Sequence, residues 1–305
     1  MELGQLRALR QLGDRGSIAA VAAAMHVTPS SISQQISALQ RRSVAPLTHK
    51  DGRRTALTDA GRALAAAAID VEVALERAEQ AVARFQGTPS GSVSVAAFHS
   101  AGWAIFGPLI AALSGHDGPE VRLSDFDVAQ EDFPALTTEH DLVLAHRLVG
   151  SPSWPASVRA EPLLFEPLDI AVRRDHPVLV AEIGGVDLRD QDWVAVHEGF
   201  PLEQAVTLMA GIGGGEARVL HRINEFRVAT AVVSASGCIA LMPRYTSDLR
   251  GHPDLVLRPV ADPGLGRHID CLARPETLER ATVKTVLAEI RTIAATLGDR
   301  SGRCT

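Results

Sequence analysis

Cysteine, aromatic residues and long apolar runs are all scarce in this sequence. The three cysteines, Cys238, Cys271 and Cys304, lie far apart and form no CxxC pair, which argues against both a disulfide framework and a zinc site. The longest apolar run, residues 18–25, is mostly alanine and falls well short of the ~20 residues that a membrane-spanning helix needs. This run is also too short, and begins too late, to favour a signal peptide. We therefore expect a protein of the reducing cytoplasm with no membrane partner.

Charge is unevenly distributed along the chain. Its 305 residues suggest about two domains at ~150 residues each, and 46% hydrophobic with 22% charged residues is typical of a folded chain. Residues 1–58 carry eight Lys or Arg against three Asp or Glu, which gives them a net charge of +5. Because the whole chain has a net charge of −6, residues 59–305 have a net charge of −11. The first aromatic residue is Phe85, so the basic head must be a small helical unit with an aliphatic core. A basic head on an acidic body indicates two regions of different chemistry.

Three helices are predicted in the head. Leucines recurring along residues 3–12 predict the first, and the alanine-rich run 18–25 predicts the second. Thr28 followed by Pro29 predicts the start of a third helix, because the threonine oxygen accepts an orphan amide and proline needs no donor at the first helical position. We expect this helix to run to about Arg42.

The third helix has two different faces. Ile32, Ile36 and Leu39 fall on one side at 100° per residue, and the other side carries Ser30, Gln34, Ser37 and Arg41. In a helix-turn-helix motif, residues near the start of the second helix reach base edges in the major groove. Serine hydroxyls and glutamine amides suit that task. The alternative is an ordinary solvated helix face.

A short hairpin is predicted after the third helix. Asp51-Gly52 forms its turn, cations flank the turn on both sides, and residues 55–57 return as a strand. This is the pattern of a wing whose cations contact phosphates and position the protein on DNA. Each cation taken alone could equally be a solvated charge. Together, the helices and the wing predict binding to double-stranded DNA.

A dense and ordered set of residues marks this head: Gly16-Ser17-Ile18, Ala22, Ala23, Val27-Thr28-Pro29-Ser30-Ser31-Ile32-Ser33-Gln34-Gln35-Ile36, Leu39, Gly52-Arg53-Arg54 and Leu57-Thr58-Asp59-Ala60-Gly61. The set resembles the winged helix-turn-helix of LysR-type transcriptional regulators. The resemblance implies that residues 28–35 begin the recognition helix, with Pro29, Ser30, Ser33 and Gln34 nearest the bases. Ile18 and Thr48 stand where the family usually has phenylalanine, and Ser43-Val44-Ala45 replaces its glycine-containing turn. These departures concern the packing under the wing.

The residues expected to contact DNA are therefore Ser17, Thr28, Pro29, Ser30, Ser31, Ser33, Gln34, Gln35, Ser37, Arg41, Lys50, Arg53 and Arg54.

A heptad pattern follows the head within residues 59–88. Apolar residues recur there with spacing 4-3-4-3-4-3, at Leu64, Ala68, Val71, Leu75, Ala78, Val82 and Phe85. Such a seam predicts a coiled coil that joins two chains. The alternative is a helix packed on its own chain. A dimer suits an operator, because two recognition helices must lie about one turn of DNA apart. The family resemblance implies that this is the linker helix of a homodimer, and that two dimers form a homotetramer.

Residues 89–305 read as an α/β body. Strands are expected at 92–98, 121–126, 141–145, 168–172, 193–196, 238–242 and 269–273, and helices at 104–113, 130–138, 202–209, 226–236 and 276–297. Alternating strands and helices imply a parallel sheet. The body is similar to the family's effector domain, a periplasmic-binding-protein-like pair of lobes, on the marks Glu166-Pro167-Leu168, Asp175-His176-Pro177 and Gly237 with Ile239-Ala240-Leu241-Met242-Pro243. Lobe I would be 89–165 and 267–305, and lobe II 166–266.

A ligand is expected beyond the carboxyl ends of the strands, where α/β sheets bind small molecules. The residues expected there are Ser100, Ala101, Gly102, Asp127, Val128, His146, Arg147, His197, Glu198 and Gly199. Ser100 at a strand-to-helix turn can bond a carboxylate, and Arg147 would supply a fixed cation. Because Asp127 and Glu198 oppose that cation, a polar metabolite with an acidic group is only slightly preferred to a basic or zwitterionic one.

An enzyme is the competing class. The sequence contains no HExxH, GxSxG or P-loop, and the glycines at 211–215 follow a helix rather than a strand, which favours a loop over a phosphate cradle. Each candidate histidine is more often a surface residue than a ligand contact. We therefore predict a non-enzymatic transcriptional regulator that senses a small molecule, with no cofactor and no metal. An α/β enzyme or binding protein with an accessory helical head is the alternative.

Overall fold

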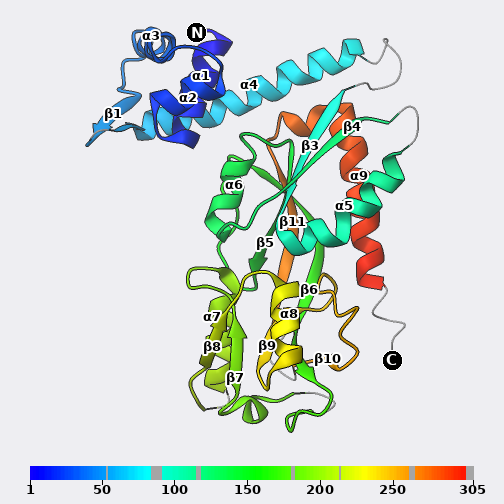
Figure 1. Cartoon of the computed structure of the whole chain (residues 1–305). Coiled ribbons are helices and arrows are strands. Elements are labelled where there is room, and N and C mark those ends of the chain that lie inside the picture. The colour runs from blue at the N-terminus through cyan, green and yellow to red at the C-terminus, as the bar shows by residue number, and fades with distance from the viewer. Residues whose placement is uncertain are drawn as a thin grey trace. The chain divides into compact units, whose positions relative to one another are not determined.

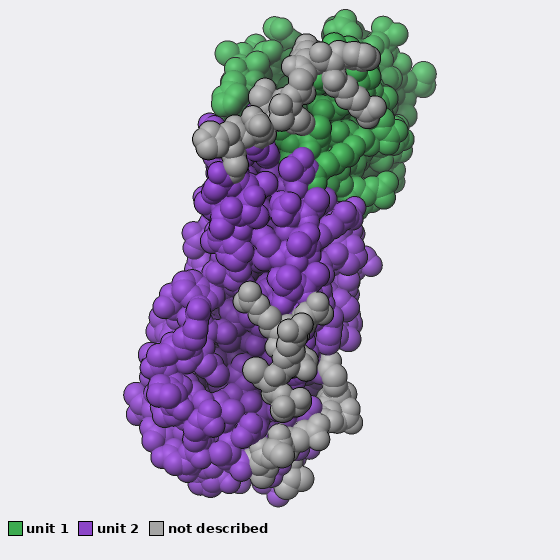
Figure 2. Space-filling view, turned by 90° about the vertical axis from the view of Figure 1, so that its right-hand side faces the viewer, with its two compact units in different colours: residues 1–89, 155–159, 274–284 green, residues 90–154, 160–273, 285–305 purple. Residues whose placement is uncertain are grey.

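The computed structural model describes residues 1–52, 54–83, 91–114, 118–179, 183–212, 214–260 and 265–299. The chain divides into two compact units, which Figure 2 shows in different colours. Unit 1 comprises residues 1–89, 155–159 and 274–284, and unit 2 comprises residues 90–154, 160–273 and 285–305. The head and the linker helix therefore belong to one unit, together with two short segments from the body that sequence patterns did not assign to it.

Unit 1 contains the three expected helices, the expected hairpin and the long helix (Figure 1). They are α1 Leu3–Arg15, α2 Ile18–Ala24, α3 Pro29–Gln40, β1 Thr48–Asp51, β2 Arg54–Leu57 and α4 Asp59–Ala83. The predicted cap of α3 is confirmed, because the Thr28 hydroxyl accepts the backbone N–H of Ser31 at 3.2 Å and Pro29 follows it. Ser17 caps α2 in the same way, accepting the N–H of Ala20 at 3.1 Å.

The core of unit 1 is aliphatic, as the absence of aromatic residues predicted. Buried leucine, isoleucine, valine and alanine side chains come from all three head helices, the hairpin and the first half of α4. The turn after α3 lacks glycine and is held by Gln40 instead, whose Oε1 accepts the N–H of Leu47 at 2.7 Å. Gly61 at the start of α4 permits a close approach, since a Cβ there would lie 2.0 Å from the carbonyl oxygen of Leu47. These contacts fix the wing against α4.

Unit 2 contains most of the remaining elements. In chain order they are β3 Ser92–Ala97, α5 His99–Leu113, β4 Glu120–Asp125, η1 Gln130–Asp132, α6 Phe133–Leu136, β5 Leu142–Leu148, β6 Arg159–Arg173, η2 Gly185–Leu188, β7 Asp192–Ala195, α7 Pro201–Ile212, β8 Arg218–Arg222, α8 Phe226–Ala235, β9 Ile239–Pro243, β10 Leu255–Arg258, β11 Gly266–Ala273, η3 Thr277–Glu279 and α9 Ala281–Asp299. Of these, η3, the first residue of β6 and the first residues of α9 lie in unit 1. Among the described residues, no helix is long and apolar enough to cross a membrane.

Apart from the β1-β2 hairpin, the strands of the described residues form one nine-stranded sheet in the order β4-β3-β5-β11-β6-β9-β7-β8, with β10 paired to β6. The expectation of a parallel sheet is only partly correct. β3 is parallel to β4 and β5, and β7 is parallel to β8 and β9. In contrast, β11 is antiparallel to β5, and β6 is antiparallel to β9 and β10. The reason is the path of the chain. β6 leads from one half of the unit into the other and β11 leads back, so neither strand is part of a strand–helix–strand crossover.

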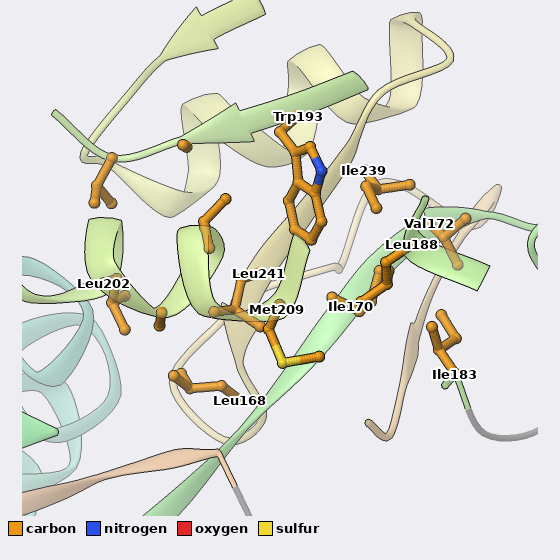
Figure 3. Packing of buried hydrophobic residues seen from close by; sticks show 14 of the residues in the cluster. Leu168, Ile170, Val172, Ile183, Leu188, Trp193, Leu202, Met209, Ile239 and Leu241 are labelled. Atoms are coloured by element: carbon orange, nitrogen blue, oxygen red, sulfur yellow. The ribbon is translucent and has the colours of Figure 1, made fainter. Parts of the chain in front are cut away.

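We call the half built on β3, β4, β5 and β11 lobe I, and the half built on β6 to β10 lobe II. β6 runs through Glu166 without a break, and β11 begins at Gly266. The two strands approach closely here, since a Cβ on Gly266 would lie 2.2 Å from the Phe165 ring. Figure 3 shows the main core of lobe II, where side chains from β6, β7, β9 and α7 converge with Trp193 fully buried among them.

Two elements have boundaries that differ from prediction, and as a result several candidate ligand residues lie inside a helix or strand rather than in a loop. α5 begins at His99 rather than Ala104, so Ser100, Ala101 and Gly102 form its first turn instead of a loop. β5 continues to Leu148 rather than ending at Ala145, so His146 and Arg147 lie inside the strand. β8 and β10 were not predicted at all. Both are short, and most of their residues are exposed or half-buried, so they lack the apolar run of a buried strand.

Candidate DNA-binding surface and ligand pocket

The polar face of α3 is exposed and its apolar face is buried. Ile32, Ile36 and Leu39 are at most 7% exposed and belong to the core of unit 1. The exposed residues on or beside the helix are Thr28, Pro29, Ser30, Gln34, Ser37 and Arg41, and Ser17, Ser31, Ser33 and Gln35 are half-buried. Gln35 faces α1, since its Oε1 is buried, has no hydrogen-bond partner among the described residues and lies 3.6 Å from the Cβ position of Gly4. It is therefore turned away from the exposed face, unlike Gln34.

The wing carries exposed cations and belongs to the same unit as this helix. β1 and β2 pair antiparallel with Asp51 opposite Arg54, and Gly52 in the turn has a positive φ of 59°. Lys50 and Arg54 are exposed. Arg53, also expected to contact phosphate, lies outside the described residues.

The heptad seam of α4 is divided between two environments. Ala68 is fully buried and Leu64 partly buried against the head's own core, so the alternative of packing on the same chain holds for the first half of α4. Val71 and Val82 are 45% and 62% exposed, Ala78 is exposed, and Leu75 is half-buried. Phe85 lies outside the described residues. In the part of the seam that the structure describes, uncovered apolar surface thus begins at Val71.

A pocket lies between the two lobes of unit 2. It encloses ≈ 430 Å³ of empty space including its open mouth, and its lining residues are Phe98, His99, Ser100, Asp127, His146, Val196, Phe200, Leu202, Asn224, Phe226 and Arg267. Of the ligand residues predicted from sequence, it brings together Ser100, Asp127 and His146. At the mouth, the amide of Asn224 in lobe II donates to Asp127 of lobe I at 2.9 Å.

The pocket's cation is Arg267, and it is held by a buried carboxylate. Its Nε donates to Oε2 of Glu166 at 2.9 Å, and its Nη2 donates to the hydroxyls of Ser100 at 3.0 Å and Thr246 at 2.8 Å. Arg267 is 1% exposed and Glu166 is fully buried. Burial lowers the pKa of the guanidinium below its ordinary value, and the charge and hydrogen bond of Glu166 partly offset this. An arginine guanidinium nevertheless stays protonated in proteins. The side chains of this cluster come from β11, β6, the turn after β9 and the start of α5.

Aromatic rings surround the charged cluster. The guanidinium carbon of Arg267 lies 4.8 Å from the ring centre of Phe98 and 5.9 Å from that of Phe226. The His146 ring packs edge-on against Phe98 at 4.6 Å. Burial holds the pKa of His146 well below its ordinary value of 6.5, and the charge of Arg267 lowers it further. His146 is therefore neutral at pH 7, and its buried Nδ1 has no hydrogen-bond partner among the described residues.

Several residues expected at the pocket lie elsewhere. Arg147 points to the opposite face of β5 from His146, because side chains alternate along a strand, and there it donates to Asp270 at 3.0 Å. Glu198 is exposed and pairs with Arg222 at 3.0 Å. His197 and Gly199 are exposed, Val128 is half-buried, and Ala101 and Gly102 are buried within the first turn of α5, and none of these five lines the pocket. Arg147 therefore does not line this pocket, where it was expected to supply the fixed cation.

A wider groove adjoins the pocket at His99. It encloses ≈ 1130 Å³ of empty space including open solvent, and Trp103, Phe106, Asp125, Glu225 and Arg227 are among its lining residues. The Arg227 guanidinium stacks 4.3 Å from the ring centre of Trp103, and that of Arg250 lies at 5.6 Å. These contacts join α5 of lobe I to lobe II beside the pocket.

Comparison with known proteins decides the family. Residues 3–62 match the bacterial regulatory helix-turn-helix protein of the lysR family, and residues 86–295 match the LysR substrate binding domain. The chain belongs to the LysR family. This LysR-type protein is a DNA-binding transcriptional regulator with an effector-binding domain, and its two parts are those that the sequence resemblance implied.

Individual relatives are distant. The regulator is 30% identical to the RuBisCO operon transcriptional regulator of Acidithiobacillus ferrooxidans over 178 residues, which is 58% of this chain and 56% of that one. It is 26% identical to the transcriptional activator IlvY of Salmonella typhimurium over 72% of this chain and 78% of the relative. The match thus spans little more than half the length of the first relative.

Solved structures share the fold over nearly the whole chain. A full-length OxyR variant from Pseudomonas aeruginosa aligns with a TM-score of 0.66 at 19% identity and covers 95% of both chains. Full-length CbnR complexed with its target DNA aligns with a TM-score of 0.51 at 22% identity, covering 96% of this chain and 100% of that one. These similarities establish the architecture of the LysR-type regulator.

Sequence reasoning missed the central residues of the regulator's pocket. In the sequence, Glu166 was noted only as part of the family resemblance. No sequence pattern pointed to Arg267, Thr246 or Asn224 as ligand-site residues, because each lies in a polar or loop-like stretch. Phe98, Phe200 and Phe226 were visible as aromatics in a chain that has few, which is the one signal that could have pointed to them. Among the described residues, no group of three His, Cys, Asp or Glu side chains could hold a metal ion.

Proposed function

We propose that this LysR-type regulator recognises its operator through the exposed face of α3, with Ser30 and Gln34 at base edges and Lys50 and Arg54 on phosphates. The observation that carries this proposal is the arrangement of α3, whose polar residues are exposed over a buried apolar face directly after the Thr28 cap. Residues near the start of a recognition helix are those that reach bases in the major groove. The cations of the wing add contacts without sequence preference.

The regulator works on DNA as an oligomer. We place the dimer contact on the second half of the seam, at Val71, Leu75, Ala78 and Val82, where apolar side chains are uncovered. A two-fold dimer presents two recognition helices to two half-sites, which a monomer cannot do. Association of two dimers gives the homotetramer that the family resemblance implies.

The pocket between the lobes binds the effector, and the chain catalyses no reaction. Ser100, His146 and Arg267 would contact the ligand. The organisation that goes with this role is a DNA-binding domain at 1–58, a linker helix at 59–88 and an effector domain at 89–305. A protein that acts on promoter DNA in this way works in the cytoplasm.

Retardation of a promoter fragment in a gel tests the proposed function. The purified chain is incubated at low salt with the intergenic DNA upstream of its own gene and with an unrelated fragment of equal length. We expect retardation of the first at protein concentrations that leave the second free. Failure to retard any fragment from the gene's neighbourhood would remove the proposed DNA recognition.

A further inference from the structure

We propose that the pocket between the lobes selects an uncharged, ring-shaped ligand and excludes carboxylates, because the chain supplies its own carboxylate at the position an acid would occupy. This inference rests on the proposed effector-sensing role and specifies the chemistry of that site. It replaces the slight preference for acids, which depended on Arg147. That residue pairs with Asp270 on the opposite face of β5.

The first step is the charge balance of the pocket. Arg267 is the only Arg or Lys among the described residues that line it. Its charge is matched by Glu166 in a pair from which solvent is excluded, with exposed fractions of 1% and 0%. An acid entering the pocket would therefore meet a guanidinium that is already neutralised.

The second step is that Glu166 cannot be displaced. Its Oε1 accepts the backbone N–H groups of Tyr245 at 2.8 Å and Thr246 at 2.6 Å, and its Oε2 accepts the Thr246 hydroxyl at 3.2 Å. A competing carboxylate would strip Arg267 from a fully buried anion and leave that anion without a countercharge. Uncompensated buried charge is among the most destabilising changes a protein can undergo. The built-in ion pair therefore outcompetes a soluble acid.

The third step concerns the other titratable groups around the pocket. Asp127 at the mouth adds negative charge, and His146 is held neutral by burial beside Arg267. His99 faces Asp125, with Nε2 and Oδ2 3.2 Å apart, so any positive charge on it is opposed. The lining residues thus offer an acid no unpaired cation.

The remaining surface fits a flat, uncharged molecule. Three phenylalanine rings, Phe98, Phe200 and Phe226, line the walls together with Val196 and Leu202. The imidazole of His146, whose Nδ1 has no hydrogen-bond partner among the described residues, supplies a polar group without net charge. The amide of Asn224, which also contacts Asp127, supplies a second. Apolar walls with a few neutral hydrogen-bonding groups are the usual lining of a site for a small uncharged ligand.

Three probes of one size and different charge test the inference: benzamide, benzoate and benzylammonium, each added at millimolar concentration to the full chain at pH 7.5. Thermal unfolding reports binding, because a ligand of the folded state raises the melting temperature. We expect benzamide to raise it by ~2 °C or more and benzoate to leave it unchanged. A larger shift with benzoate or benzylammonium than with benzamide would overturn the charge selection and leave the pocket as the sensing site. No shift with any probe would overturn both the inference and the proposed sensing role.

The variant Glu166→Gln sharpens the comparison, because it frees the guanidinium while keeping the shape of the side chain. We expect benzoate to shift the melting temperature of this variant and not of the wild type. Glu198→Gln is the matched control, since Glu198 is exposed and lies outside the lining. Should Glu166→Gln not fold, Asp127→Asn at the exposed mouth takes its place, with a smaller benzoate shift expected. Failure of the folded variants to gain any benzoate response would contradict the role assigned to these carboxylates.

Discussion

The guanidinium of Arg10 donates to Glu72 at 2.6 Å and to Glu276 at 2.8 Å while only 3% of its side chain is exposed. These residues join α1, α4 and the segment 274–284 within unit 1. Arg274 strengthens the same connection by pairing with Asp14 at 2.7 Å. Arg274 directly follows β11, the strand that carries Arg267 of the pocket. The segment 274–284 is therefore anchored by ion pairs to α1 and α4 within unit 1.

Replacing Arg10 should destabilise unit 1 strongly. Arg10→Met leaves the buried Glu72 without its close partner, and breaking a buried ion pair on one side costs ~3–5 kcal/mol. Arg7→Met is the matched control, because Arg7 lies 3.8 Å from the same carboxylate but is 47% exposed, and such a pair contributes at most ~1 kcal/mol. Urea unfolding followed by circular dichroism measures both. Equal losses for the two variants would show that the Arg10 pair has no special role.

The pH dependence of stability should contain a contribution from His146. Burial holds its folded-state pKa well below 6.5, so the unfolded chain takes up a proton that the folded chain refuses. The stabilising contribution is complete above pH 6.5 and is lost as the pH falls toward the folded pKa, by up to ~1.4 kcal/mol per pH unit. His146→Phe should therefore lose less stability than the wild type between pH 7.5 and 5.5. The exposed His197→Ala variant should follow the wild type, and identical slopes in all three would contradict the assignment.

Charge in the two halves of the α4 seam should have different effects. Val71→Asp and Val82→Asp place carboxylates on surface that is exposed within the chain, so we expect light scattering to report a smaller species with a nearly unchanged melting temperature. Ala68→Asp places a carboxylate in the fully buried core of unit 1 and should unfold that unit. If Val71→Asp and Val82→Asp both kept the wild-type mass, the dimer contact would lie elsewhere.

Substitutions on α3 and on the wing should separate specificity from affinity. Gln34→Ala should cost ~1–3 kcal/mol at one base position and relax preference there. Arg54→Ala should weaken binding to all sequences similarly and lower the salt slope by about one. Fluorescence anisotropy on single-base variants of the operator measures both effects. A uniform loss with Gln34→Ala, equal at every base, would show that this side chain does not contact a base.

Sequence patterns predicted the head far better than the pocket. The helices of the head begin and end at local signals such as Thr28-Pro29 and Ser17, which act through backbone groups only a few residues away. The pocket depends on contacts between distant residues, as in the pair Glu166 and Arg267, and no local pattern encodes them. Arg147 illustrates how a local pattern misplaces a residue. β5 ends three residues later than expected, so Arg147 lies inside the strand and pairs with Asp270 rather than lining the pocket. Burial of Arg10 and Glu72 was equally invisible in the sequence.

Recognition of a specific DNA sequence by α3 is the central claim, and the ratio of two dissociation constants tests it most directly. One is measured for the footprinted operator and the other for a scrambled duplex of the same composition, both at ~0.15 M salt where non-specific binding is weak. The account predicts that the operator binds at least ~10³-fold more tightly, and that Gln34→Ala narrows this ratio while Arg54→Ala preserves it. Equal dissociation constants for the two duplexes would contradict sequence recognition by this chain.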